Sequence, residues 1–298
     1  MSECGQLYGC IEAGGTKFVA AIARAPGDII ESARFDTISP NVTIGATIAW
    51  LKEAEARHGT LRAIGIASFG PLELDRNAAN WGYITTTTKA GWSDCDFAGR
   101  IAREFGMPVG FDTDVNGAAL AEARWGAGQG AKISIYITVG TGIGGGAIVG
   151  GKPLHGLSHP EMGHIRPARH PDDMEFAGVC PFHGDCLEGL ASGPAIKARW
   201  GGSLSQLGPG HAANDIVAYY LAQMAVTLQS VMEPGRIIFG GGVLGAPGLL
   251  ARVQNEAVRL GKGYFRGAAN EIITAPRLGD MSGLLGGLAL AMDAADRS

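Results

Sequence analysis

Histidine and cysteine side chains gather in one stretch of the chain, between positions 155 and 188. Five of the seven histidines lie there, and Cys180 and Cys186 flank His183 in a Cys-x-x-His-x-x-Cys spacing. Thiolate and imidazole are the ligands that Zn²⁺ prefers, and a structural zinc takes four of them in a tetrahedron. The spacing therefore predicts a zinc site to which Cys180, His183 and Cys186 supply three ligands.

The fourth zinc ligand must come from outside this Cys-His-Cys knuckle. His164 is favoured because it follows Glu161 in the sequence Glu-Met-Gly-His, where it would join the metal to a polar pocket. His159 and His170 are the competing choices. The alternative interpretation is a loop that is rich in histidine and cysteine but binds no metal.

The whole-chain composition limits the class of protein. The chain has 298 residues, of which 17% are charged and 46% hydrophobic, and 48 are glycine. These values indicate a compact globular protein that is long enough for two lobes. The net charge is −4 and the basic residues are scattered, so the electrostatic pattern of a nucleic-acid-binding protein is missing and no nucleic-acid partner is expected.

Several features favour a cytoplasmic protein without a membrane partner. Cys4, Cys10 and Cys95 are isolated in the sequence, which suits a reducing compartment better than a disulfide framework. The N-terminus shows no basic-then-apolar secretion signal. The uncharged run 216–232 is shorter than a usual membrane span and contains two glutamines, so a buried helix is expected there.

A pattern of strand, glycine-rich turn and strand occurs twice, as YGCIEAGGTKFVAAI at 8–22 and YITVGTGIGGGAIV at 136–149. Two such hairpins in opposite halves predict a duplicated α/β fold. The boundary is expected near Gly117, which gives a small N-terminal lobe over 1–116 and a large lobe over 117–280. The large lobe would carry the zinc loop 155–188, and the last helix, 281–298, would pack back on the first lobe.

Apolar spacing and turn residues predict the individual elements. Strands are expected at 7–13, 18–23, 29–35, 63–67, 107–111, 133–139, 147–149, 236–239 and 272–275. Helices are expected at 42–58, 97–105, 115–125, 187–200, 212–232, 249–260 and 281–293. Asp96 is expected to cap the helix that begins at 97.

Glycine turns after strands suit phosphate binding, because bare backbone N–H groups can approach anionic oxygens closely. The turn at 14–17 lacks the earlier glycine and the following helix of a Walker loop. The run Gly140-x-Gly142-x-x-Gly145 matches the dinucleotide fingerprint in letters but leads into a strand. The run 240–245 matches it too, after a strand and before a helix, which leaves a nicotinamide-dependent oxidoreductase as an alternative.

Two phosphate hairpins and a further glycine turn for an adenine describe a nucleotide held between two lobes. Phosphoryl transfer also needs a carboxylate that accepts the proton of the acceptor hydroxyl. The sequence Asp112-Thr113-Asp114-Val115-Asn116 ends a predicted strand and begins a helix. Asp114 is predicted to be this base, Asp112 to cap the helix or support the site, and Asn116 to bind a hydroxyl. The alternative is that an aspartate here only caps the helix.

With these motifs in place, the chain resembles the ROK family of sugar kinases and repressors, within the actin–hexokinase–heat-shock fold. The motifs that carry the resemblance span the chain: 12–17, 112–116, 138–146, 161–164, 180–188 and 239–243. The run Gly-Tyr-Ile-Thr-Thr-Thr at 82–87 and the Cys-His-Cys knuckle resemble the bacterial fructokinase branch. The implied fold is α/β, a two-lobed ribonuclease-H-like duplication with a zinc-binding insert.

The resemblance implies ATP-dependent, Mg²⁺-assisted phosphorylation of a hexose at its 6-hydroxyl, with fructose favoured and glucose or mannose as alternatives, by a homodimer. Asp114 would be the general base. The sugar would be held by Asn116, Glu161, His164 and Glu188, with the turn at Gly70 and Pro71. ATP would be bound by Gly14, Gly15, Thr16, Lys17, Thr141, Gly142, Gly241 and Gly242. The structural zinc would be bound by His164, Cys180, His183 and Cys186.

Three residues depart from the family pattern: Glu12 stands where many members have aspartate, Thr113 where asparagine is commoner, and His183 where the wider family has cysteine. The first departure weakens a direct Mg²⁺ role for Glu12. Two other function classes fit the sequence less well. A repressor would need an N-terminal helix-turn-helix, whereas the first strand is expected near Leu7. A non-catalytic zinc scaffold would leave Asp114 without a purpose.

Overall fold

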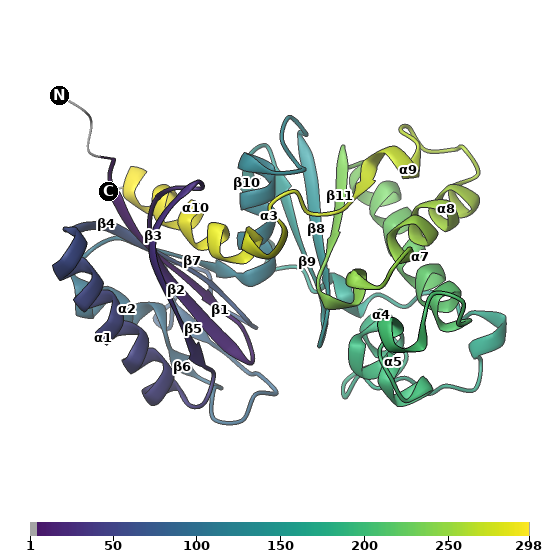
Figure 1. Ribbon diagram of the computed structural model, residues 1–298, viewed down its shortest axis with the longest axis horizontal. Helices are drawn as coiled ribbons and strands as arrows, with labels where there is room; N and C mark the ends of the chain where they lie inside the picture. Colours follow the sequence, from purple (N-terminus) through teal and green to yellow (C-terminus); the bar gives the residue numbers. More distant parts are fainter. Residues whose placement is uncertain (1–4, 298) are drawn as a thin grey trace. The chain divides into compact units, whose positions relative to one another are not determined.

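The computed structural model describes residues 5–297, so Cys4 lies outside the described part of the chain. The chain divides into two compact units (Figure 1). Unit 1 comprises Met1–Ala121, Leu154–His159 and Asp280–Ser298, and unit 2 comprises Glu122–Pro153 and Pro160–Gly279. The first boundary thus falls five residues after the predicted one, and the short segment Leu154–His159 belongs to unit 1, not to the second lobe as expected.

Unit 1 is built on a five-stranded sheet with the order β3-β2-β1-β4-β7. Its strands are β1 Leu7–Ala13, β2 Lys17–Ala25, β3 Asp28–Asp36, β4 Leu61–Ser68 and β7 Val109–Thr113. The first three are antiparallel, whereas β4 and β7 run parallel to β1. Helices α1 (Pro40–His58) and α2 (Ala98–Phe105) cover one face, and α10 (Ser282–Asp296) covers the other (Figure 1).

The central strands β1 and β4 are buried on both faces of the sheet, which explains why they read as continuous apolar runs and not as alternating ones. The core between the sheet and α1 and α2 includes Ile11, Ile64 and Ile66. Aromatic rings fill it further, and Phe18 lies 5.5 Å from both Trp92 and Phe97 between ring centroids. Trp92 lies between the two strands of a short ribbon, β5 (Tyr83–Ile84) and β6 (Cys95–Asp96).

The last helix, α10, lies against the backbone of the unit 1 sheet because glycine removes the side chains between them. A Cβ atom on Gly65 of β4 would lie 1.9 Å from the carbonyl oxygen of Gly287. A Cβ atom on Gly110 of β7 would lie 2.2 Å from the carbonyl oxygen of Leu290. Only glycine permits this approach. The C-terminal helix is thereby part of the first unit.

Unit 2 repeats the same sheet with the order β10-β9-β8-β11-β12. Its strands are β8 Ile133–Val139, β9 Ile143–Val149, β10 Lys152–Pro153, β11 Arg236–Gly240 and β12 Ile273–Thr274. As in unit 1, the central strand pairs antiparallel with its hairpin partner and parallel with the strand on its other side. The duplicated α/β fold predicted from the two glycine hairpins is confirmed.

The remaining helices connect and cover these sheets. They are α3 Asp114–Trp125, α4 Leu187–Ala191, α5 Gly193–Trp200, α6 Leu204–Leu207, α7 Ala213–Met232, α8 Leu249–Gly261 and α9 Ala269–Ile272. Short 3-10 turns are η1 Met162–His164, η2 Pro171–Asp173, η3 Gly242–Gly245 and η4 Gly279–Met281. Within residues 5–297, no helix has both the length and the apolar character needed to cross a bilayer.

Two local predictions were wrong. Asp96 does not cap α2, because the N-cap residue is Phe97 and the Asp96 carboxylate instead pairs with Arg103, with 2.6 Å between Oδ2 and Nη2. The single helix expected over 187–200 is two helices, because the backbone at Ser192 is extended and interrupts it. Ser192 is the N-cap of the second of these helices, α5, and its hydroxyl accepts a hydrogen bond from the backbone N–H of Ala195.

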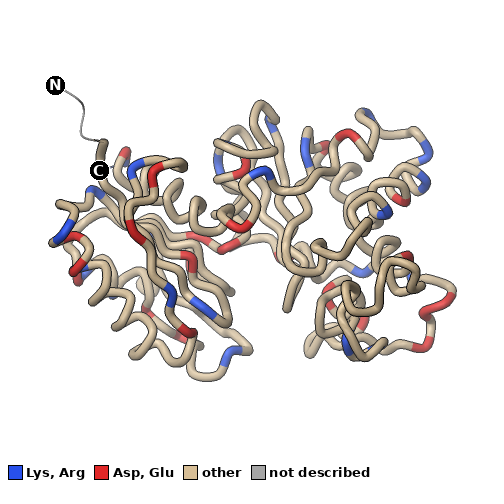
Figure 2. The backbone as a smooth tube through the Cα atoms, viewed as in Figure 1, with Lys and Arg blue, Asp and Glu red and all other residues tan. Residues whose placement is uncertain are grey.

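Acidic and basic residues are interspersed along the tube of both units, without a long run of one sign (Figure 2). Several pair across elements at the surface of unit 1, as in the 2.6 Å contact between Lys52 Nζ and Glu104 Oε2. Such exposed pairs contribute about 0–1 kcal/mol each. The stability of the units therefore depends on the packing described above.

The close approach of α10 predicts the effect of adding one methyl group. Gly65→Ala would force the carbonyl of Gly287 away from the sheet, and we expect a loss of about 3 kcal/mol in the free energy of unfolding. Gly27→Ala is the matched control, since a Cβ atom there meets nothing within 4 Å. The urea midpoints of both variants measure the difference, and equal midpoints would contradict the packing described for α10.

Candidate active site and metal centre

Asp114 lies at the junction of β7 and α3, where it is the first residue of the helix. Its Oδ1 accepts a hydrogen bond from the backbone N–H of Val115 at 2.9 Å, and its side chain is half-buried. The helix is capped by Thr113, whose hydroxyl oxygen accepts from the backbone N–H of Asn116 at 3.1 Å. Helix N-termini stabilise negative charge. The predicted base is therefore at a position that suits a carboxylate.

Asp112 does not cap the helix, as one of the two expectations had it, because it is the penultimate residue of β7 and is only 2% exposed. Its Oδ1 accepts from the backbone N–H of Thr113 at 2.8 Å and from the Asn116 amide nitrogen at 2.7 Å. Its Oδ2 lies 2.8 Å from the Nε2 of His155. The other predicted role, support of the site, is the one that its contacts match.

Asn116 is held in one orientation by this carboxylate. Because its amide nitrogen donates to Asp112, its Oδ1 must point the other way. That oxygen is buried and has no hydrogen-bond partner among the described residues. A buried acceptor without a donor is costly unless a ligand or water supplies one. Its chemistry fits the hydroxyl-binding role predicted for Asn116.

The first predicted phosphate loop forms the tip of the hairpin between β1 and β2. The backbone N–H of Gly14 donates to the carbonyl of Lys17 at 2.9 Å, which closes the turn, and Gly15, Thr16 and Lys17 are exposed. Burial raises the pKa of the nearby Glu12 carboxyl, and Asp280 acts in the same direction. Lys17 and Arg34 oppose this shift.

The turn at Gly70 and Pro71, which was assigned to the sugar, also belongs to unit 1. It follows β4 directly, and the Gly70–Pro71 peptide bond is cis. The next residue, Leu72, is buried and forms a bridge to Ile84. The structure thus places this turn after β4 and the Asp112–Asn116 motif after β7, at the carboxyl ends of two neighbouring parallel strands.

In unit 2, two residues predicted to bind ATP line one cavity of about 440 Å³. They are Thr141, from the hairpin between β8 and β9, and Gly242, which follows β11. The adjacent Gly241 has φ +89°, and a Cβ atom there would lie 2.5 Å from the carbonyl oxygen of Val139. Gly242 begins a 3-10 turn and α8 starts only at Leu249, so the dinucleotide fingerprint fails on its structural context.

Part of this cavity was missed from the sequence. Its other wall comes from α5 and α6, and includes Gly193, Pro194, Ser203, Leu204 and Ser205. The backbone N–H of Gly193 donates to the carbonyl of Gly140 at 2.8 Å and joins this wall to the hairpin. The Gly193-Pro194 pair is a helix-start signal that could have revealed the wall.

Glu188 of α4 binds the same hairpin. Its Oε2 accepts from the backbone N–H of Ile143 at 2.9 Å. A Cβ atom on Gly142 would lie 2.7 Å from this oxygen. The carboxylate that the resemblance assigned to the sugar therefore also fixes the shape of the turn that carries Thr141 and Gly142.

The four predicted zinc ligands lie together in unit 2, with all ligand atoms of His164, Cys180, His183 and Cys186 within 4.8 Å of one another. The two Nδ1 atoms are 3.3 Å apart, and the contacts between Nδ1 and Sγ atoms are 3.4, 3.7 and 3.8 Å. Zinc bonds of about 2.0 Å to nitrogen and 2.3 Å to sulfur give tetrahedral edges of roughly 3.3 to 3.8 Å. The donor set and its spacing fit a tetrahedral zinc.

His164 presents its two ring nitrogens to different groups. Nδ1 faces the cysteines, whereas Nε2 lies 3.9 Å from Oε2 of Glu161. A metal bound at Nδ1 fixes the orientation of the ring and so of the opposite nitrogen. One imidazole can therefore serve both the metal and the neighbouring polar group.

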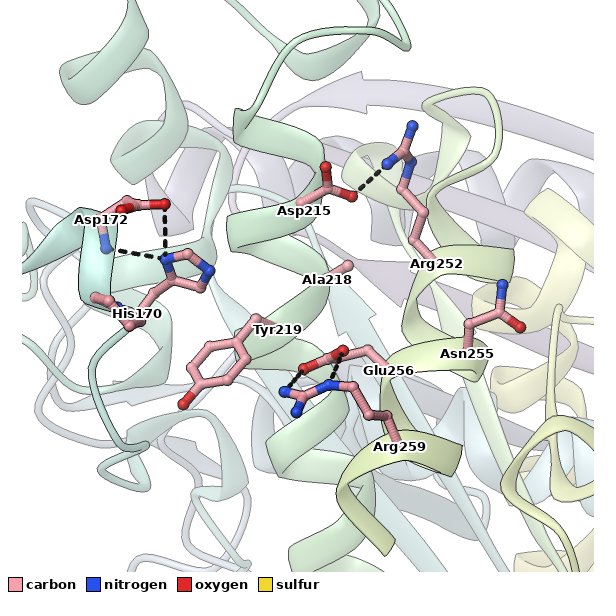
Figure 3. Close-up of a pocket in the computed structure, with 10 residues that line it drawn as sticks. His170, Asp172, Asp215, Ala218, Tyr219, Arg252, Asn255, Glu256 and Arg259 are labelled. Carbon is pink, nitrogen blue, oxygen red and sulfur yellow. Dashed lines mark hydrogen bonds and ion pairs between the residues drawn. The ribbon is translucent and has the colours of Figure 1, made fainter. Parts of the chain in front are cut away.

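The two competing choices for the fourth ligand lie elsewhere. His159 accepts a hydrogen bond from the backbone N–H of Leu72 in unit 1, at 3.2 Å from its Nε2. His170 lines a cavity of about 700 Å³ beside Tyr219 (Figure 3). Its Nδ1 accepts from the backbone N–H of Asp172 at 3.2 Å. The same cavity is lined by two ion pairs, Asp215–Arg252 and Glu256–Arg259, and the two charges of each pair neutralise each other (Figure 3).

The insert that carries the metal cluster is anchored by a second buried group. Asp173 accepts from the Tyr220 hydroxyl at 2.6 Å and pairs with Arg199, with 2.8 Å between Oδ2 and Nη1. Arg169 donates to the carbonyl oxygens of Asp173 and Phe176. This network ties the insert to α5 and α7, and the sequence offered no spacing signal for it.

The shared strand topology of the two sheets is that of an actin-like α/β fold, and similarity to known proteins identifies the family. Residues 8–294 match the ROK family. The chain is 49% identical over 296 residues to the fructokinase of Zymomonas mobilis subsp. mobilis, with 98% of each chain covered. This chain belongs to the ROK family, so the predicted family and fold class are confirmed.

Two crystal structures show the same architecture. The ROK hexokinase from Thermus thermophilus superposes with a TM-score of 0.81 at 28% identity, covering 98% of this chain and 100% of that one. A ROK family glucokinase from Streptomyces griseus, in complex with glucose and AMPPNP, superposes with a TM-score of 0.75 at 26% identity. The aligned parts are 96% of this chain and 99% of the glucokinase.

The Glu188 contact predicts a stability effect. Glu188→Ala would leave the N–H of Ile143, a residue that is only 3% exposed, without its acceptor. We expect a loss of about 1–3 kcal/mol in the free energy of unfolding. Glu188→Gln keeps an acceptor oxygen and should recover most of this loss. Urea denaturation measures both variants, and an unchanged midpoint for Glu188→Ala would contradict the role given to this carboxylate.

Proposed function

We propose that this protein is an ATP-dependent hexose kinase that converts D-fructose and ATP to fructose 6-phosphate and ADP. The observation that carries the proposal is the 49% identity with a fructokinase over nearly the full length of both chains. The site chemistry described above supports it, because a carboxylate, a hydroxyl-binding amide and glycine turns are what sugar phosphorylation requires.

Asp114 is the general base of this proposal. It accepts the proton of the sugar 6-hydroxyl while that oxygen attacks the γ-phosphorus of ATP, and ADP leaves. Asn116 accepts a hydrogen bond from a second sugar hydroxyl through its buried Oδ1. Glu161, His164 and Glu188, with the Gly70–Pro71 turn, complete the sugar site. These roles agree with the position of Asp114 at the start of α3 and with the distances around Glu161 and Glu188.

ATP is held by the two hairpins in this proposal. Residues 14–17 and the pair Thr141 and Gly142 bind phosphate oxygens through backbone N–H groups. Gly241 and Gly242 bind the adenosine beside the 440 Å³ cavity. Mg²⁺, when bound with ATP, neutralises charge on the phosphates.

Glucose is the second candidate substrate. The Streptomyces griseus glucokinase was crystallised with glucose and AMPPNP, and its fold is shared over almost the whole chain. Its identity to this chain is 26%, against 49% for the fructokinase. Because the identity to the glucokinase is the lower of the two, fructose is the first choice of substrate. Mannose is a further candidate and is tested together with fructose and glucose.

A cytoplasmic location and a homodimer complete the proposal. ATP is the substrate, and the described cysteines, at positions 10, 95, 180 and 186, form no disulfide, which suits a reducing compartment. The dimer rests on the resemblance to the family.

The catalytic prediction concerns Asp114. Asp114→Asn removes the proton acceptor with little change of shape, and we expect kcat for fructose to fall at least about 100-fold, with a smaller effect on sugar binding. Asp28→Asn, which removes an exposed ion pair of the same unit, should keep wild-type kcat. A coupled ADP-release assay with fructose, glucose and mannose measures these values. A near-normal kcat in the Asp114→Asn variant would show that Asp114 is not the general base.

The metal prediction concerns the Cys/His cluster. The purified protein should contain about one zinc per chain. Cys186→Ser should lose the metal. Its affinity for sugar should fall more than its affinity for nucleotide, because Glu161 and Glu188 flank the cluster in sequence. Cys95→Ser, outside the cluster, should keep its zinc. Elemental analysis and sugar titration measure both, and protein that is active without metal would refute the structural role of zinc.

A further inference from the structure

A short segment of the chain, Leu154–His159, belongs to unit 1 although the residues before and after it belong to unit 2. The chain thus enters unit 1 for six residues and leaves it again. We call these residues the crossover segment. The segment ends two residues before Glu161 and five before His164. Whatever holds it in unit 1 therefore also sets where the loop with Glu161 and His164 begins.

Polar contacts, not an apolar anchor, fix the crossover segment. Leu157 is fully exposed. The Ser158 hydroxyl donates to the carbonyl of Leu72 at 2.9 Å, and the backbone N–H of Leu72 donates to the Nε2 of His159 at 3.2 Å. The backbone of one buried residue is thus held from both sides. Leu72 follows the Gly70–Pro71 turn, so the far end of the crossover segment is attached to a turn that the proposed function assigns to the sugar.

The near end of the segment is attached to the base motif. Nε2 of His155 donates to Oδ2 of Asp112 at 2.8 Å, and the Asp112 carboxylate is 3% exposed whereas the His155 ring is 41% exposed. The hydrogen bond that His155 donates to Asp112 raises the pKa of the imidazole and outweighs the opposing effect of burial. The charged group acting on this ring is Asp112. The pair is therefore an imidazolium and a carboxylate over a wider pH range than a free histidine would allow.

Asp112 distributes its two oxygens between different partners. Oδ1 binds the N–H of Thr113 and the amide of Asn116, whereas Oδ2 binds His155. Without His155, Oδ2 would be a buried carboxylate oxygen lacking this donor, which is costly. The carboxylate could lower that cost by rotating, and rotation would break the hydrogen bond that orients the Asn116 amide.

We propose that His155 is a positioning residue for the sugar: it clamps Asp112, Asp112 orients the Asn116 amide, and the crossover segment couples this orientation to the loop that carries Glu161 and His164. The proposal rests on the proposed function, because it assigns Asn116, Glu161 and His164 to sugar hydroxyls. His155 acts through Asp112 and does not itself touch substrate. The consequence is selective, since none of these contacts involves a residue that the proposed function assigns to ATP.

Steady-state kinetics of three variants test the clamp. His155→Ala should raise KM for fructose about tenfold, the effect of one lost hydrogen bond to a charged group, and leave KM for ATP within about twofold of wild type. His155→Gln can place an N–H donor near the position of Nε2 and should restore most of the fructose KM. The matched control is His58→Ala, which removes a second half-buried histidine–carboxylate pair of unit 1, at 2.6 Å from Glu31, and should change neither constant.

Two kinetic outcomes overturn the proposal. One is a fructose KM in His155→Ala that equals that of His58→Ala. The other is an equal rise of both KM values without recovery in His155→Gln, which would indicate a general loss of structure. If the wild-type protein phosphorylates no hexose, the proposed function fails instead. The two failures are therefore distinguishable.

The clamp itself has a readout that needs no activity. The imidazole of His155, identified in NMR spectra by its absence in His155→Gln, should titrate above the ordinary histidine pKa of about 6.5, and Asp112→Asn should bring it back. Because folding raises this pKa, the pair stabilises the protein below about pH 6.5 and this contribution is lost as the pH rises through the folded-state value. A His155 pKa at or below 6.5 would refute the clamp.

Discussion

The backbone contact between α10 and the sheet of unit 1 is the constraint on which the site in that unit depends. A Cβ atom on Gly286 of α10 would lie 2.4 Å from the carbonyl carbon of Gly117 in α3. Gly117 is three residues after Asp114, and β7 pairs in register with β4, with Asp112 opposite Ala67. Because helix and strand backbones touch without intervening side chains, the first turn of α3 has little freedom to shift. The direction of the Asp114 side chain follows from that packing.

The buried carboxylate of Glu122 is bound by three backbone N–H groups. Glu122 is fully buried, and its oxygens accept from the N–H groups of Ala127, Arg277 and Leu278 at 2.7, 3.1 and 2.9 Å. The chain passes between the units at Ala121–Glu122 and at Gly279–Asp280, so this carboxylate joins the two segments next to the passages. Backbone donors have fixed directions, and they therefore determine a carboxylate position more narrowly than a flexible lysine would.

Features that depend on local sequence could be predicted. The two hairpins, the junction at Asp112–Asn116 and the Cys-His-Cys knuckle each follow from periodicity, glycine placement or ligand spacing within about fifteen residues. Contacts between distant segments could not. His155 forms a hydrogen bond with Asp112, 43 positions away in the sequence. Arg199 pairs with Asp173, and it lies in α5, whose start after Ser192 the sequence did not predict. Asp96 shows that even a local prediction can fail, because its carboxylate pairs with Arg103 and does not cap α2.

The Cys/His cluster lies between β10 and α4, where the second repeat departs most from the first. In unit 1 the third strand, β3, has nine residues and α1 begins at Pro40, four positions after it ends. In unit 2 the corresponding strand, β10, has two residues, and the next α-helix, α4, begins at Leu187. The intervening chain contains only two 3-10 turns and exposes Leu157, Met174 and Phe182. A segment with so little core of its own needs other links, and the Cys/His cluster and the buried Asp173 network are the links that this chain supplies. Three of the residues that the proposed function gives to the sugar, Glu161, His164 and Glu188, lie within or next to this stretch of sequence.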